Sequence, residues 1–327
     1  MTNTLTYIEH PGTIELPGWS IPFALTLPAD WNPQRELPSA ILLVPGSLFS
    51  DVNGDYPAWN SFPHVYAHLA RKLSALGHAV FRYAKIGPGT GSVTTTHEAP
   101  IPRTWDGRHQ MTAGAFAAMR DELARREVKV ARVIGAGHSE GAVAVSVLAT
   151  SAAGADLDGV VLLSGPSVGI LEIMREQVGF GRAPEDVDAA RAQLDEVIAI
   201  MRRGEPVPAK YAEGGGLGAS ALASMPPEAQ QYMRDVDATN PTMLAREITQ
   251  PLLIVQGGND TSVPAHHGER LRDAAGDRAE YLFVAEVTHM YKVVPAHLSP
   301  PEVFGYPGET DHRVTDGIDR WIRRIPS

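Results

Sequence analysis

Short apolar segments recur along this chain, with helix-forming stretches between them. The segments cover residues 40–44, 79–83, 130–134, 160–163, 252–255 and 281–284. They are nearly continuous in apolar residues rather than alternating, which is typical of strands buried on both faces of a parallel sheet. Helices are expected between them over residues 65–76, 111–126, 142–151 and 266–275. The pattern predicts an α/β fold with a doubly wound, mostly parallel sheet, whose ligand site lies beyond the carboxyl ends of the strands.

The flanking segments set the predicted domain organisation. Residues 5–16 and 21–27 alternate in polarity and include Pro22, which predicts an antiparallel pair at one edge of the sheet. Residues 166–247 contain no convincing core strand, so they are predicted to form a helical lid inserted into a core of residues 1–165 and 248–327. Apolar residues at helical spacing over 187–201 predict a lid helix. The glycines of residues 214–218 predict a mobile loop that gates the site.

A serine flanked by glycines lies where the strand at 130–134 leads into a helix. Residues 137–141 read Gly-His-Ser-Glu-Gly. A glycine two residues to either side of Ser139 permits a sharp turn, because a Cβ there would collide with the neighbouring strand or helix. Such a turn exposes a serine hydroxyl beside backbone N–H groups that can hold an oxyanion. The alternative, a dinucleotide-binding turn, is disfavoured because Glu140 would put a carboxylate where the pyrophosphate should approach.

An acid and a base for Ser139 follow two later strands. Acyl transfer through serine needs a base to take the proton and a carboxylate to fix the tautomer of that base. A glycine-rich turn after residues 252–255 presents Asp260, and the loop after residues 281–284 presents His289. We therefore expect Ser139, Asp260 and His289 at the same edge of the sheet.

The order Ser139, Asp260, His289, each after a successive strand, resembles the α/β-hydrolase superfamily, in particular its serine esterase and acyl hydrolase branch. The segment Val-Pro-Gly-Ser at 44–47 is also similar to a loop of esterase members. The resemblance implies an α/β-hydrolase fold with a lid and no cofactor. It also implies an oxyanion hole formed by the backbone N–H groups of Ser47 and Glu140. Leu48 is the alternative to Ser47, because the sequence leaves the exact turn open.

The chain departs from the family in the loop after the second parallel strand. Many members carry R-x-D-x-R-G-x-G-x-S there, but this chain has Ala84 for the usual acid and Ile86 for the usual second arginine. Both usual residues brace a loop near the site, so we expect a differently built pocket wall. Candidate wall residues at the catalytic edge are Leu48, Trp105, Met290 and Tyr291. Ordinary core packing explains the last three equally well.

The remaining histidines are assigned structural roles. His64 and His68 have metal-ligand spacing on a helix, but no accompanying motif, so they are expected on a solvated face and no metal site is predicted. His266 and His267 are also expected at the surface. His138 is expected to pack beside the elbow, the sharp turn of residues 137–141 that carries Ser139. The carboxylate of Glu140 is expected to be a packing or first-turn group.

Composition narrows the function further. The absence of cysteine excludes thiol catalysis, cysteine-based zinc sites and disulfides. The net charge of −10, with basic residues scattered, argues against nucleic acid or an anionic membrane as partner. No apolar stretch approaches the ~18 residues that a spanning helix needs, so we expect no membrane insertion and a soluble, cytoplasmic protein.

These observations predict a serine hydrolase that cleaves a small-molecule carboxylic ester through an acyl-enzyme. The first alternative is a thioesterase, or an amidase or peptidase, that uses the same catalytic triad of Ser139, His289 and Asp260. A non-catalytic binding protein on a hydrolase scaffold is the second. Homo-oligomer formation is left open.

Overall fold

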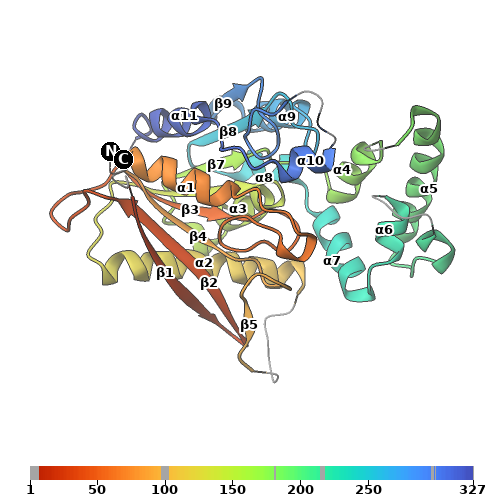
Figure 1. The fold of residues 1–327 in the computed structure, drawn as a ribbon, viewed down its shortest axis with the longest axis horizontal. Helices are drawn as coiled ribbons and strands as arrows, with labels where there is room; N and C mark the ends of the chain where they lie inside the picture. The colour runs from red at the N-terminus through yellow and green to blue at the C-terminus, as the bar shows by residue number, and fades with distance from the viewer. Residues whose placement is uncertain are drawn as a thin grey trace.

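The computed structural model describes residues 7–96, 103–179, 182–213, 218–295, 298 and 300–326. Within these residues, nine strands form one sheet (Figure 1). The strands are β1 (Tyr7–Leu16), β2 (Trp19–Pro28), β3 (Ala40–Val44), β4 (Ala79–Tyr83), β5 (Val93–Thr94), β6 (Val133–His138), β7 (Gly159–Leu163), β8 (Leu252–Gly257) and β9 (Ala279–Val284). Their order is β1-β2-β4-β3-β6-β7-β8-β9, with β5 paired to β2.

The sheet is mostly parallel, as predicted. Strands β4, β3, β6, β7, β8 and β9 run parallel to one another, while β1 and β2 form the expected antiparallel pair at one edge and β2 is also antiparallel to β4. The predicted strand over 130–134 is wrong in its bounds, because β6 begins at Val133 and continues to His138. Val130 instead forms an isolated bridge with Leu37. The end of β6 is rich in glycine because neighbours approach closely there, and a Cβ on Gly135 would lie 2.8 Å from Val145 Cγ2.

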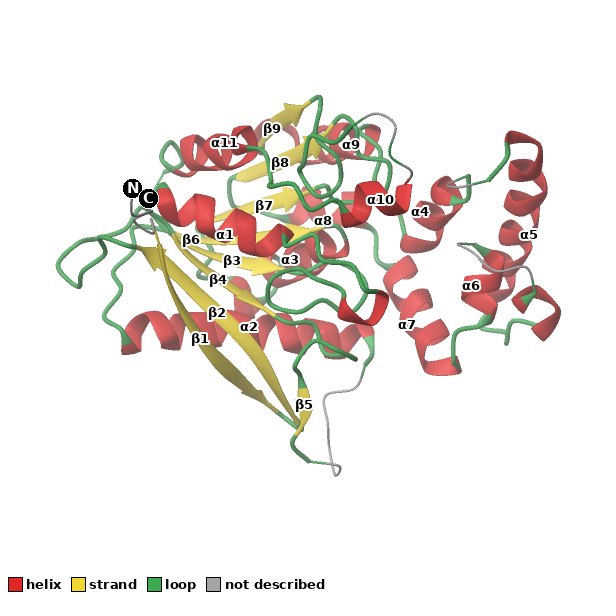
Figure 2. Cartoon of the chain, in the orientation of Figure 1, coloured by secondary structure: helices red, strands yellow, loops and turns green. Residues whose placement is uncertain are grey.

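Helices cover both faces of the sheet (Figure 2). The helices α1 (Val65–Ala75) and α11 (His312–Ile322) pack on one face of the sheet. The apolar core between them and the sheet includes the side chains of β3, β7 and β8 that point towards this face. The other face carries α2 (Trp105–Arg125), α3 (Glu140–Ala149), α8 (Pro241–Glu247) and α9 (His266–Ala275). Helix α2 begins six residues earlier than the predicted 111, because Thr104 caps it by accepting a hydrogen bond from Gly107 N–H at 3.1 Å. The short helix α10 (Pro300–Gly305) precedes α11.

The segment between β7 and β8 is helical and contains α4 (Ile170–Gln177), α5 (Pro184–Arg202), α6 (Ala219–Ala223) and α7 (Pro227–Ala238), followed by α8. Helices α4 to α6 share an apolar cluster of their own. In Figure 1, α5 and α6 stand to one side of the sheet, with α7 between them and the core. Helix α8 instead packs on α3 and α9.

The helix predicted over residues 187–201 is present as part of α5. Most of the predicted gating loop, residues 214–217, lies outside the described residues. The domain boundaries at 166 and 247 and the role of the insertion as a lid stay predictions. Among the helices of the described segments, none has the length and apolarity needed to cross a membrane.

Candidate active site

Ser139 occupies a strained turn between β6 and α3. Its backbone has φ 57° and ψ −124°, a region that side-chain-bearing residues seldom adopt. The flanking glycines are required sterically: a Cβ on Gly137 would overlap the Gly141 carbonyl, and a Cβ on Gly141 would overlap the Val44 carbonyl. The local sequence therefore allows the turn that lifts Ser139 to the carboxyl edge of the sheet, and Glu140 begins α3 directly after it.

Asp260 and His289 form a buried pair at the same edge. Asp260 lies in the turn after β8, where its Oδ1 accepts hydrogen bonds from the backbone N–H groups of Ser262 and Val263 at 2.9 and 2.8 Å. Its Oδ2 lies 2.8 Å from His289 Nδ1. Because an ionised carboxylate only accepts, Nδ1 carries the proton and Nε2 is left as the basic nitrogen.

His138 links His289 to the turn that carries Ser139. The two imidazole rings lie 4.5 Å apart, and His138 Nε2 donates to the His289 carbonyl at 2.9 Å. The Tyr66 hydroxyl accepts from Gly46 N–H at 2.8 Å and lies 3.2 Å from His138 Nδ1. Burial lowers the pKa of His138 to about 3, so it stays neutral. No hydrogen bond from the Ser139 hydroxyl to a described residue is seen.

The loop of residues 45–47 lies beside the elbow, where a Cβ on Gly46 would be 3.1 Å from Ser139 Cβ. Within the parts of the chain that the structure describes, neither Ser47 N–H nor Glu140 N–H donates to a protein acceptor. Both are therefore available to a ligand oxygen. Leu48 has φ 66° and is 46% exposed.

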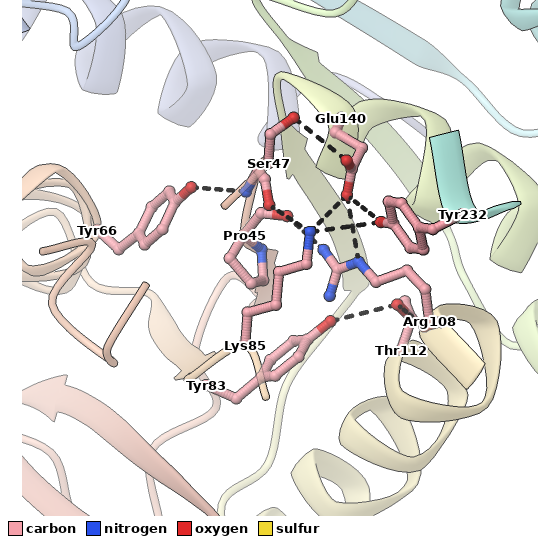
Figure 3. Close-up of polar contacts among 10 residues, drawn as sticks. Pro45, Ser47, Tyr66, Tyr83, Lys85, Arg108, Thr112, Glu140 and Tyr232 are labelled. Carbon is pink, nitrogen blue, oxygen red and sulfur yellow. Dashed lines mark hydrogen bonds and ion pairs between the residues drawn. The ribbon is translucent and has the colours of Figure 1, made fainter. Parts of the chain in front are cut away.

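A buried cluster of charged groups surrounds the Glu140 carboxylate (Figure 3). Lys85 Nζ and the Tyr232 hydroxyl each donate to Glu140 Oε1 at 2.7 Å, and Arg108 Nε lies 3.9 Å from the same oxygen. We call Lys85, Arg108, Glu140 and Tyr232 the Glu140 cluster.

The ionisation of the cluster follows from its burial and its charges. Burial lowers the pKa of Lys85 to about 8, although Glu140 opposes that shift. Burial alone would raise the pKa of Glu140, but Lys85 and Arg108 outweigh it and hold the pKa below its usual value. Near neutral pH the cluster therefore contains two cations and one carboxylate.

The sequence did not indicate this cluster. The packing or first-turn role expected for the Glu140 side chain left out the hydrogen bonds that its carboxylate accepts from Lys85 and Tyr232. Its members come from the end of β4, the first turn of α2, the start of α3 and the insertion. One local signal was present: Lys85 lies two residues after β4, at the carboxyl edge of the sheet, in the loop that departs from the family pattern.

The candidate wall residues have different environments. Trp105 is buried, its Nε1 donates to Thr239 Oγ1 at 2.9 Å, and its ring packs edge-on against Tyr232. Met290 and Tyr291 are buried in the core on the side of α1 and α11. A role for these residues, or for Leu48, in the pocket wall stays a prediction.

The surface placement expected for His267 is wrong, because its side chain is fully buried. Its Nε2 lies 3.0 Å from Glu176, and His266 Nε2 lies 3.5 Å from the same carboxylate oxygen. This group has metal-ligand residue types, but Ser167 N–H donates to His267 Nδ1 at 3.2 Å. The proton of the neutral ring is therefore on Nε2, where it donates to Glu176 rather than leaving a lone pair for a metal.

The remaining features lie away from Ser139. His64 pairs with Asp55 at 2.7 Å, and His68 is partly buried. A surface depression of about 680 Å³ is lined by α5 together with Lys210 and Tyr211, all within the insertion. None of the predicted catalytic residues lines this depression, so we do not assign the active site to it.

Comparisons with known proteins agree with this architecture. The sequence model of the alpha/beta hydrolase family matches residues 41–304. Esterase EstD of Thermotoga maritima is 25% identical over 313 residues, which cover 95% of this chain and 65% of EstD. The chain thus spans just under two thirds of the length of that relative.

Two solved structures show the same fold. Est1E from Butyrivibrio proteoclasticus has a TM-score of 0.54 at 16% identity, with 95% of this chain and 97% of Est1E covered. A structure from work on two fungal esterases of Rhizomucor miehei has a TM-score of 0.55 at 13% identity, with 98% and 84% covered. With most of its length matched by the family model, the chain belongs to the alpha/beta hydrolase family.

Proposed function

We propose that the chain is a serine hydrolase that cleaves small-molecule carboxylic esters through an acyl-enzyme. The observation that carries this proposal is the Asp260–His289 pair, joined at 2.8 Å beside the strained turn of Ser139. The similar proteins EstD and Est1E support the choice of substrate, since the first is named an esterase and a structure of the second contains ferulic acid.

In the proposed mechanism, Ser139 Oγ bonds to the ester carbonyl carbon while His289 Nε2 takes the hydroxyl proton. Asp260 stabilises the imidazolium and keeps the proton of Nδ1 in place. The carbonyl oxygen becomes an oxyanion, which the N–H groups of Ser47 and Glu140 bind, with Leu48 as the alternative to Ser47. His289 then returns the proton to the alcohol as the carbon–oxygen bond breaks. Water then bonds to the acyl carbon while His289 Nε2 takes its proton. The bond from that carbon to Ser139 Oγ breaks as His289 gives the proton to Oγ, which releases the acid and restores Ser139.

The test is to replace the nucleophile and to label it. Ser139→Ala should lower kcat for a p-nitrophenyl ester by ~10⁴-fold or more, because the triad acts as a unit. Ser164→Ala is the matched control, since Ser164 is a buried serine with positive φ at the end of the neighbouring strand β7. A fluorophosphonate should form a phosphorus–oxygen bond to Ser139 Oγ with loss of fluoride. An Ser139→Ala variant that keeps a tenth of the activity would refute the assignment.

Substrate comparison separates the alternatives. An ester, a thioester and an anilide of the same acyl group should show the highest kcat/KM for the ester. Preference for the thioester or the anilide would make the chain a thioesterase or an amidase. Failure of Ser139 to react with the fluorophosphonate would favour a binding protein. A cytoplasmic location remains a prediction, and the oligomeric state remains open.

A further inference from the structure

The Glu140 cluster holds the loop that carries the second proposed oxyanion donor. Each residue of this loop contacts a different member of the cluster. Arg108 Nη2 donates to the Pro45 carbonyl, Lys85 Nζ donates to the Gly46 carbonyl at 3.3 Å, and the Ser47 hydroxyl donates to Glu140 Oε2 at 3.2 Å (Figure 3). Side-chain contacts on three successive residues leave this loop little freedom.

Glu140 is the one residue that belongs to both halves of the proposed oxyanion hole. Its backbone N–H is the first donor, and its carboxylate accepts from the hydroxyl of Ser47, whose backbone N–H is the second donor. An oxyanion hole depends on donors placed about 2.7–3.1 Å from the oxygen. A side chain that joins the two donor residues therefore sets the spacing that this chemistry requires.

The cluster also has an excess of positive charge in a buried place. The side chains of Lys85, Arg108 and Glu140 are 8%, 1% and 3% exposed. Two cations and one carboxylate leave one uncompensated positive charge, and Arg108 Nη1 has no partner among the described residues. Charges interact more strongly in a buried site than in water, so this charge favours a negative oxygen nearby.

The insertion contributes to the same cluster. Tyr232 from α7 donates to Glu140, and Lys85 Nζ lies 3.4 Å from the Tyr232 hydroxyl. Trp105 fixes the end of α7 through Thr239. Helix α7 is thus bonded directly to the residue that follows the nucleophile.

We infer that the Glu140 carboxylate is the positioning group of the oxyanion hole, and that Tyr232 joins the insertion to it. This inference rests on the proposed function. Lys85 and Arg108 hold the carboxylate from the core, and Tyr232 holds it from the insertion. The position of α7 therefore determines whether the N–H groups of Ser47 and Glu140 lie where both can bind the oxyanion.

The test measures stabilisation of the transition state separately from substrate binding. Glu140→Gln should lower kcat for p-nitrophenyl acetate by about 10²-fold, the size expected for loss of one oxyanion donor, while KM changes less than about threefold. Tyr232→Phe removes a single hydroxyl and should lower kcat by about tenfold, because a hydrogen bond to a charged group is lost. Affinity for a trifluoromethyl ketone, which adds to Ser139 as an oxyanion, should weaken by the same factors.

Two variants control for general effects. Asp319→Asn changes the partner of the buried His78 far from the site, at the amino end of β4. Glu176→Gln removes the charge from a different contact between the insertion and the core, the one with His267. Both should keep kcat within about twofold, since neither carboxylate touches the loop of residues 45–47.

The outcomes separate the inference from the proposed function. If Glu140→Gln and Tyr232→Phe keep kcat and ketone affinity within threefold while Ser139→Ala is inactive, the inference is wrong and the proposed function stands. If Ser139→Ala is active, the proposed function is wrong. Should Glu140→Gln fail to fold, Tyr232→Phe decides: a change in KM alone would overturn the inference.

Discussion

Acidification should destabilise the fold through His138. Burial lowers the pKa of this imidazole from 6.5 to about 3 in the folded protein, so between these values the unfolded chain binds a proton that the folded chain does not. Stability contributed by the neutral ring is therefore present above pH 6.5 and is lost as the pH falls towards 3. Each pH unit in that window corresponds to ~1.4 kcal/mol, so the loss between pH 6.5 and pH 5 is about 2 kcal/mol.

The assay is urea unfolding, followed by circular dichroism at pH 7 and at pH 5. Replacement of the titrating group in His138→Gln should reduce the free energy of unfolding at pH 7, because the bonds to Tyr66 and to the His289 carbonyl are weakened. Between pH 7 and pH 5, the free energy of unfolding of His138→Gln should then fall by about 2 kcal/mol less than that of the wild type. Groups that do not contact His138 should titrate alike in both proteins and cancel in this comparison.

Tyr66→Phe is the matched control. It removes a hydrogen-bonding partner of His138 but keeps the buried imidazole. We therefore expect lower stability at both pH values and the same loss between them as in the wild type. If His138→Gln loses as much stability as the wild type between pH 7 and pH 5, the linkage argument is refuted.

Two further predictions concern the elbow and the cluster. Gly141→Ala places a Cβ against the carbonyls of Val44 and Pro45, so it should displace the loop of residues 45–47, which carries a proposed oxyanion donor. We expect kcat at saturating ester to fall by at least about tenfold; wild-type kcat would show that the loop tolerates the shift. Because the pKa of Lys85 is lowered to about 8, kcat should decline as the pH rises through 8 and the cluster loses a positive charge. Lys85→Arg keeps its charge and should remove the decline, whereas an unchanged profile in that variant would assign the decline to another group.

Most of the sheet was predictable because its strands are short, apolar and separated by helices. The runs at 40–44 and 79–83 coincide with β3 and β4. The strand β6 was misplaced because its residues 135–137 are Gly-Ala-Gly, which have weak strand preference. Its conformation depends on the close approach of α3, where Gly137 faces Gly141. No pattern of apolar residues records such a contact.

The candidate site likewise has one part that could be predicted from the sequence and one part that could not. Ser139, Asp260 and His289 each follow a core strand, so the sheet itself brings them to one edge, and the pair of Asp260 and His289 could be anticipated. Lys85 and Tyr232 could not be paired with Glu140 in advance. Their separation in sequence carries no periodicity, and the contact depends on how the insertion folds back onto the core.

The bond from α7 to Glu140 has a consequence for exchanging lids between related hydrolases. Such a lid is usually treated as a replaceable module whose sequence alters only the substrates admitted. Here a transplanted insertion without a hydroxyl at the place of Tyr232 would leave the buried carboxylate of Glu140 short of one partner, beside the proposed nucleophile Ser139. Chimeras with this core should therefore retain a tyrosine in that helix, and Lys85 should be transferred together with Glu140 when the elbow is grafted elsewhere.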